Sequence, residues 1–77
     1  MGFVIVEFVE PREVRVNGES QGQNMDDAGH YRILRVADGI QTFSLGPPAD
    51  YVPEEQAVVV GGTSLIEPLR VTFQRKS

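Results

Sequence analysis

Glycine and proline interrupt this chain so often that a helix of ordinary length has little room. The longest stretches free of both are nine residues long, at 30–38 and 69–77. A typical helix in a globular protein has about eleven residues, and both residue types are unfavourable in its interior. Eleven valines and four isoleucines outnumber four leucines, and β-branched side chains suit a pleated sheet. The spacing therefore predicts short strands joined by frequent turns.

Alternation of polar and apolar residues places the strands between these breaks. Residues 13–16 read Glu-Val-Arg-Val, which is the pattern of a strand with one buried face. Asn17-Gly18 follows, and two residues that tolerate positive φ are typical of a type I′ hairpin turn. We predict seven strands, at 3–9, 13–17, 19–23, 31–36, 40–45, 55–60 and 64–74.

Seven short strands in 77 residues favour an all-β fold, namely a small antiparallel seven-stranded β-sandwich, with a small β-barrel as the alternative. Segments 24–29 and 46–53 are predicted to be loops, because turn-forming residues concentrate there. Pro68 is expected to interrupt edge pairing in the last strand or to lie at a bulge. At this length we assign residues 1–77 to a single domain.

Charge and cysteine content argue against several classes of function. Seven basic and eleven acidic residues give a net charge of −4, which disfavours binding to nucleic acid. The absence of cysteine removes disulfides and thiolate zinc sites. No apolar run approaches the ~20 residues of a membrane helix, so we expect no membrane insertion. Five arginines alternate with apolar residues, as on an outward sheet face: Arg12, Arg15, Arg32, Arg35 and Arg70.

The turn residues of the first third of the chain form a longer pattern. A glycine and a strand are followed by a proline, a Val-x-Val strand, an Asn-Gly turn and a further glycine; the positions are Gly2, Pro11, Val14, Val16, Asn17, Gly18 and Gly22. This pattern resembles the opening of PEGA-type domains. Residues 50–53, Asp-Tyr-Val-Pro, resemble the Gly-Tyr-x-Pro segment of that family, with aspartate in place of glycine. The resemblance extends over nearly the whole chain, although residues 23–27 replace the family's usual Thr-Pro.

The resemblance implies a prealbumin-like β-sandwich module without catalytic or binding residues shared across the family. Such modules are usually appended to bacterial envelope or surface proteins. The N-terminus has no basic segment followed by a cleavage site, so the chain as it stands is expected in the cytoplasm. An extracytoplasmic location is expected if the chain is part of a larger envelope protein.

Few side chains are placed for chemistry. The one histidine, His30, lies close to Asp26 and Asp27, and these three form a candidate acid–base set or weak metal site. An ordinary loop is the favoured interpretation of these residues, because they match no zinc or calcium spacing. Tyr51 is expected to cover the core from its loop. A ligand-binding module that recognises a glycan, a small anion or a metal through residues 24–30 and 46–53 is therefore the alternative function.

The first predicted strand, 3–9, is largely apolar on both faces, with Glu7 as its one charged residue. Phe3, Ile5 and Val9 share the face opposite to Val4 and Val6. Two interpretations stay open: a sandwich of this size leaves these three residues uncovered, or the strand lies centrally and the sheets cover both of its faces. These three residues are the candidate interface, for a second copy of the chain or for another protein. The leading functional hypothesis is a non-catalytic interaction or structural module that needs no cofactor, with no catalytic and no metal-binding residues assigned.

Overall fold

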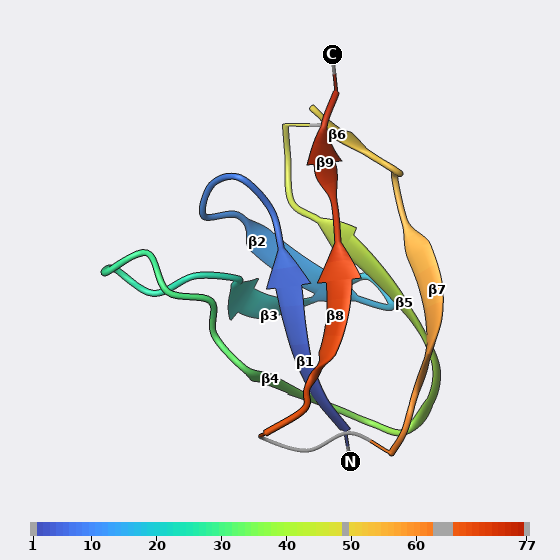
Figure 1. Ribbon diagram of the computed structural model, residues 1–77. Coiled ribbons are helices and arrows are strands. Elements are labelled where there is room, and N and C mark those ends of the chain that lie inside the picture. The colour runs from blue at the N-terminus through green and yellow to red at the C-terminus, as the bar shows by residue number, and fades with distance from the viewer. Residues whose placement is uncertain (1, 49, 63–65, 77) are drawn as a thin grey trace.

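The computed structural model describes residues 2–48, 50–62 and 66–76, and every regular element in these ranges is a β-strand (Figure 1). The all-β prediction is therefore confirmed. The strands are β1 (Gly2–Glu7), β2 (Glu13–Val16), β3 (Glu19–Gln23), β4 (Leu34–Val36), β5 (Gly39–Leu45), β6 (Tyr51–Val52), β7 (Gln56–Val60), β8 (Leu69–Thr72) and β9 (Gln74–Arg75).

The strands form two larger sheets and one small one. One sheet has the order β4-β1-β8, the second has the order β3-β2-β5-β7, and β6 pairs with β9. Figure 1 shows β1 and β8 crossing over β2 and β5, as two packed layers do. Across the described ranges the sheets remain open rather than closing into one barrel, so the structure is a small β-sandwich.

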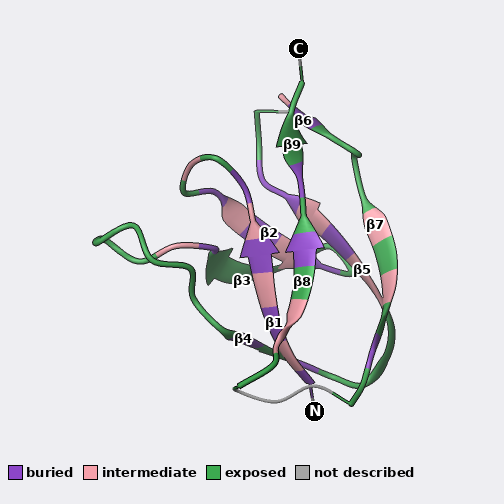
Figure 2. Ribbon diagram, viewed as in Figure 1, coloured by how far each residue is buried: buried purple, intermediate pink, exposed green. Residues whose placement is uncertain are grey.

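The core lies between the two layers and is built by alternate residues of each strand. In β1, Val4 and Val6 are fully buried, whereas Phe3 and Ile5 on the opposite face are half-buried. Figure 2 shows the same alternation along the strands that face each other. The core cluster comprises Val4, Val6, Phe8, Val14, Val16, Leu34, Val36, Phe43, Leu45, Tyr51, Val60, Val71 and Phe73.

Strand number and direction differ in part from the sequence prediction. Nine strands occur in the described ranges rather than seven, and β8 runs parallel to β1 rather than antiparallel. The parallel pair arises because β1 and β8 come from opposite ends of the chain, which leaves ample length for the crossover that parallel pairing requires. Sequence alternation reports which face a residue takes, but not the direction of the neighbouring strand.

Several strand boundaries also differ from the predicted ones. The first strand ends at Glu7, where pairing with β8 ends, so Val9 lies beyond the strand. The stretch predicted at 31–36 contributes only β4, from residue 34. The predicted loop at 46–53 contains β6, because the backbone there pairs with β9. The predicted last strand divides into β8 and β9, with β8 beginning directly after Pro68; residues 64 and 65 lie outside the described ranges.

The predicted hairpin turn is confirmed. Asn17 and Gly18 both have positive φ, of 53° and 84°, as a type I′ turn requires. The Asn17 side chain also links the turn to the neighbouring strand β5, because its Oδ1 accepts the backbone N–H of Thr42 at 2.9 Å. The β2–β3 hairpin is thereby tied to the centre of its sheet.

Candidate functional site

The loop that carries the candidate ligands Asp26, Asp27 and His30 satisfies its polar groups locally. Asp26 Oδ1 accepts the backbone N–H groups of Ala28 and His30, each at 2.9 Å. The backbone hydrogen bond from His30 lowers the pKa of Asp26 most, and the bond from Ala28 lowers it further. His30 Nδ1 lies 3.8 Å from Asp26 Oδ2, and both side chains are largely exposed. The geometry is that of an Asx turn that shapes its own loop.

Tyr51, the fourth residue of the predicted loop site, lies in the core rather than beside this loop. It is 8% exposed, and its hydroxyl donates to the carbonyl oxygen of Leu45 at 2.6 Å. Its ring packs edge-on against Phe8 and Phe73, with centroid separations of 6.3 and 5.6 Å. The structure thus places Tyr51 as a core residue. The two predicted loop segments are linked through Arg12, whose backbone N–H bonds Asn24 and whose guanidinium bonds Asp50.

Arg12, predicted on an outward sheet face, is instead buried to 8% exposure. Its guanidinium lies 5.1 Å from the Phe8 ring centroid, donates to Asp50 Oδ1 at 2.8 Å, and also pairs with Glu10. Arg75 contacts the same two carboxylates and lies over the same ring at 5.8 Å. The prediction fails because Arg12 follows Pro11 in the loop between β1 and β2, where strand alternation does not apply.

This cluster makes stability depend on pH. The hydrogen bond from Arg12 lowers the pKa of Asp50, so the folded state favours the ionised carboxylate. The stabilisation is complete above the ordinary aspartate pKa of about 4 and is lost as pH falls through the lower folded value. We expect Asp50→Asn to be less stable than the parent at pH 7, with the difference shrinking below pH about 4. Urea titrations across that range test this, and a difference independent of pH would contradict it.

Asn24 lies in a predicted loop, at the start of the candidate ligand-binding segment 24–30, and in the structure it is a structural residue. Its side chain is fully buried. Oδ1 accepts the backbone N–H of Arg12 at 2.8 Å, and Nδ2 donates to the carbonyl oxygen of Val6 at 3.2 Å. Its own carbonyl accepts the N–H of Arg32 at 2.8 Å. Asn24 therefore joins β1 to the segments that flank the second sheet, and only its polar, loop-forming residue type was visible in the sequence.

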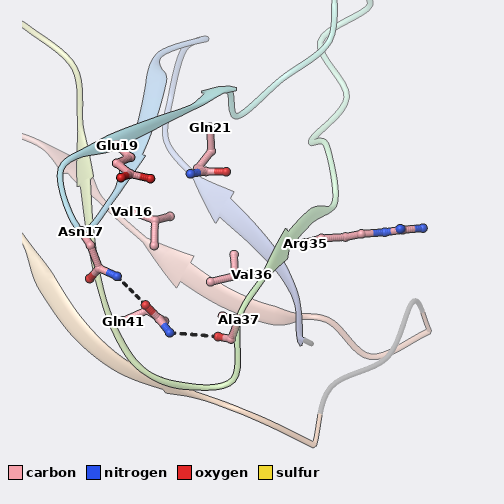
Figure 3. Close-up of a pocket in the computed structure, with 8 residues that line it drawn as sticks. All are labelled: Val16, Asn17, Glu19, Gln21, Arg35, Val36, Ala37 and Gln41. Atoms are coloured by element: carbon pink, nitrogen blue, oxygen red, sulfur yellow. Dashed lines mark hydrogen bonds between the residues drawn. The ribbon is translucent and has the colours of Figure 1, made fainter.

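A pocket of about 250 Å³ lies between the β2–β3 hairpin and the β4–β5 connection (Figure 3). The buried side chains of Val16 and Val36 are among the residues that line it. Gln41 accepts a hydrogen bond from Asn17 Nδ2 at 2.5 Å and donates to the carbonyl of Ala37 at 3.1 Å. Figure 3 shows the Arg35 side chain directed away from the pocket. The pocket is smaller than most small-molecule sites, and its central amides already bond to one another.

The candidate interface on the first strand lies on the outer face of the β4-β1-β8 sheet. Phe3 stands opposite Arg35 in the register, and Ile5 stands opposite Arg70. Both apolar side chains are only half-exposed. Val9 is 67% exposed but follows the end of β1, so the three residues do not share one strand face. Their role as an interface stays a prediction.

A more exposed apolar pair occurs on the outer face of the other sheet. Ile40 of β5 and Val59 of β7 are direct partners in the antiparallel register, and they are 72% and 69% exposed. Ala57, two residues along the same face of β7, is also exposed. The pair lies at the margin of the molecule, because β7 is the last strand of its sheet (Figures 1 and 2).

The four outermost strands of the two larger sheets differ in how they are protected. β4 carries Arg35, β8 carries Arg70 and β3 carries Glu19. β3 is polar throughout, and its register with β2 shifts between residues 13 and 15. β7 reads Gln-Ala-Val-Val-Val, so among these four it alone lacks a charged residue. Proteins normally use charge, irregularity or short length to protect an edge from pairing with another chain.

Among the described residues no helix is long and apolar enough to cross a membrane, and no group of three or more His, Asp or Glu side chains is arranged to hold a metal ion. Comparisons with protein-family models, with curated proteins and with solved structures give no match to this chain. The similarity to PEGA-type domains accordingly stays a prediction from the sequence.

Proposed function

We propose that this chain is a protein-interaction module that binds an extended polypeptide segment along the edge of β7. The observation that carries the proposal is the uncharged sequence of β7 at the open end of a four-stranded sheet. In an antiparallel ladder alternate residues direct both N–H and C=O toward one neighbour, so every second residue of β7 points these groups away from β5. An incoming strand would accept and donate those bonds and extend the sheet.

The side chains around this edge support the same proposal. An added strand would place alternate residues on the outer face beside Val59 and Ala57, extending the apolar surface that Val59 forms with Ile40. On the inner face, Gln56 donates to the carbonyl of Thr72 at 2.6 Å and so fixes the start of β7 against the other layer. The edge is held in an extended form before any partner arrives, which reduces the entropy lost on binding.

The test is an NMR titration of the protein with a neutral extended peptide, Ac-Gly-Thr-Val-Thr-Val-Thr-Gly-NH2. We expect amide shifts in β7 and in the facing part of β5, together with slower hydrogen exchange in β7. Shifts confined to β3 or to the outer face of β1, or no shifts at all, would contradict the proposal.

Val59→Lys should weaken this binding by about tenfold, because it places a charge on the pairing edge and removes apolar contact. Gln21→Lys is the matched control, since Gln21 is an exposed residue on β3 at the opposite edge of the same sheet. We expect the control to bind like the parent. Equal weakening by both variants would place the effect in overall charge rather than at β7.

A further inference from the structure

The charges around β7 point to the chemistry of its partner. Glu54 and Glu55 directly precede the strand, and both are exposed. Neither forms an ion pair with any side chain in the described ranges. Gly61 and Gly62 follow the strand at its other end and carry no charge. The edge is thus an uncharged five-residue strip with two unneutralised carboxylates at one end only.

We infer that the segment bound by β7 runs antiparallel to it and carries basic residues directly after its paired stretch. This inference rests on the proposed function. In an antiparallel pair the residues that follow the partner's strand lie beside the residues that precede β7, which are Glu54 and Glu55. Antiparallel pairing is the direction of β7 with β5, and it is slightly more stable per residue than parallel pairing.

The same charges favour a basic segment over a second copy of this chain. Two copies of β7 paired antiparallel would each set Glu54 and Glu55 opposite Gly61 and Gly62, where no cation is available. Both copies would also carry a net charge of −4. A segment with lysine or arginine after the strand instead places opposite charges next to each other at this end of the edge.

Three peptides of equal length test the inference. The first, Ac-Gly-Thr-Val-Thr-Val-Thr-Lys-Lys-NH2, has its basic pair after the strand. The second, Ac-Lys-Lys-Thr-Val-Thr-Val-Thr-Gly-NH2, has the same net charge with the pair before the strand. The third has Glu-Glu in place of the final Lys-Lys. Dissociation constants come from amide shifts in β7, and light scattering reports the mass of the protein alone.

We expect the first peptide to bind about fivefold more tightly than the second at low salt, and the third to bind most weakly. The preference should shrink at ~0.5 M salt, because exposed charges are then screened. The double variant E54Q/E55Q should bind the first two peptides equally. Both glutamates are exposed and unpaired within the described ranges, so this variant is expected to keep the fold.

The outcomes separate the inference from the function on which it rests. Equal binding of all three peptides at β7, or tighter binding of the second, would overturn the inference and leave β7 as a binding edge. A stable dimer through β7 at micromolar concentration would also overturn it, in favour of a second copy. If none of the peptides, nor the neutral one, shifted β7, the proposed function itself would fail.

Discussion

Replacement of Phe43 by alanine is expected to remove a large share of the stability of this protein. Phe43 is fully buried at the centre of β5, which pairs with both β2 and β7. Truncation of a buried phenylalanine costs about 3–5 kcal/mol, because apolar contact is lost and a cavity remains. A domain of 77 residues has a total stability of about 4–12 kcal/mol, so the change takes a large share of it.

The measurement for Phe43→Ala is thermal and urea unfolding against a control on the same strand. Ile40 is 72% exposed, and Ile40→Ala should change the free energy of unfolding by no more than about 0.5 kcal/mol. We expect the melting temperature of Phe43→Ala to fall by about 15–30 °C. A fall as small as that of the control would mean that the sheets do not pack on Phe43 as described.

Replacement of Asn24 by alanine is expected to produce the second large loss of stability. The change would remove the hydrogen-bond partner of two main-chain groups. These are the N–H of Arg12 and the carbonyl of Val6, which bonds Asn24 on the side of β1 where β4 pairs further along. Leaving a buried polar group unsatisfied costs about 1–3 kcal/mol, so we expect a total loss of about 2–4 kcal/mol. β4 pairs with β1 only as far as Val4, so no strand can supply the lost bond at Val6.

Gln23→Ala is the control for Asn24, because Gln23 is the preceding residue and is exposed. We expect Gln23→Ala to unfold at nearly the same urea concentration as the parent and Asn24→Ala to unfold at a clearly lower one. Hydrogen exchange adds a local measurement, since the amide of Arg12 should lose protection in Asn24→Ala. Retained protection of that amide would contradict the assigned role of Asn24.

The binding edge proposed at β7 could be predicted only in part from the strand pattern of the sequence. Residues 55–60 were predicted as a strand, and β7 occupies 56–60. The sequence predicts the exposed apolar surface on the first strand instead, at Phe3, Ile5 and Val9, of which Val9 is exposed and lies beyond the end of β1. The structure places β1 at the centre of its sheet, between β4 and β8, while β7 lies at an edge. An apolar run such as Val58 to Val60 can occur in a central or in an edge strand, so the sequence does not tell which of the two it forms.

The burial of the polar residues Arg12 and Asn24 could likewise not be predicted from the local sequence pattern. The sequence predicts Arg12 on an outward sheet face and Asn24 in a loop, and both residue types are mostly exposed in proteins. Both are buried, because the loop between β1 and β2 and the end of β3 meet and satisfy their hydrogen bonds. Burial of a polar side chain depends on partners that are distant in sequence, so a local pattern does not reveal it.

The sequence by itself determined the all-β class, the hairpin turn at Asn17-Gly18 and the buried face of most strands. These properties depend on a residue and its near neighbours, through backbone sterics, turn preference and alternation. Only the tertiary structure decided the strand order, the parallel β1–β8 pair, the burial of Arg12 and Asn24, and the exposure of Ile40 beside Val59 of the edge strand β7. These depend on which strands become neighbours, and that is decided by the packing of residues far apart in the chain.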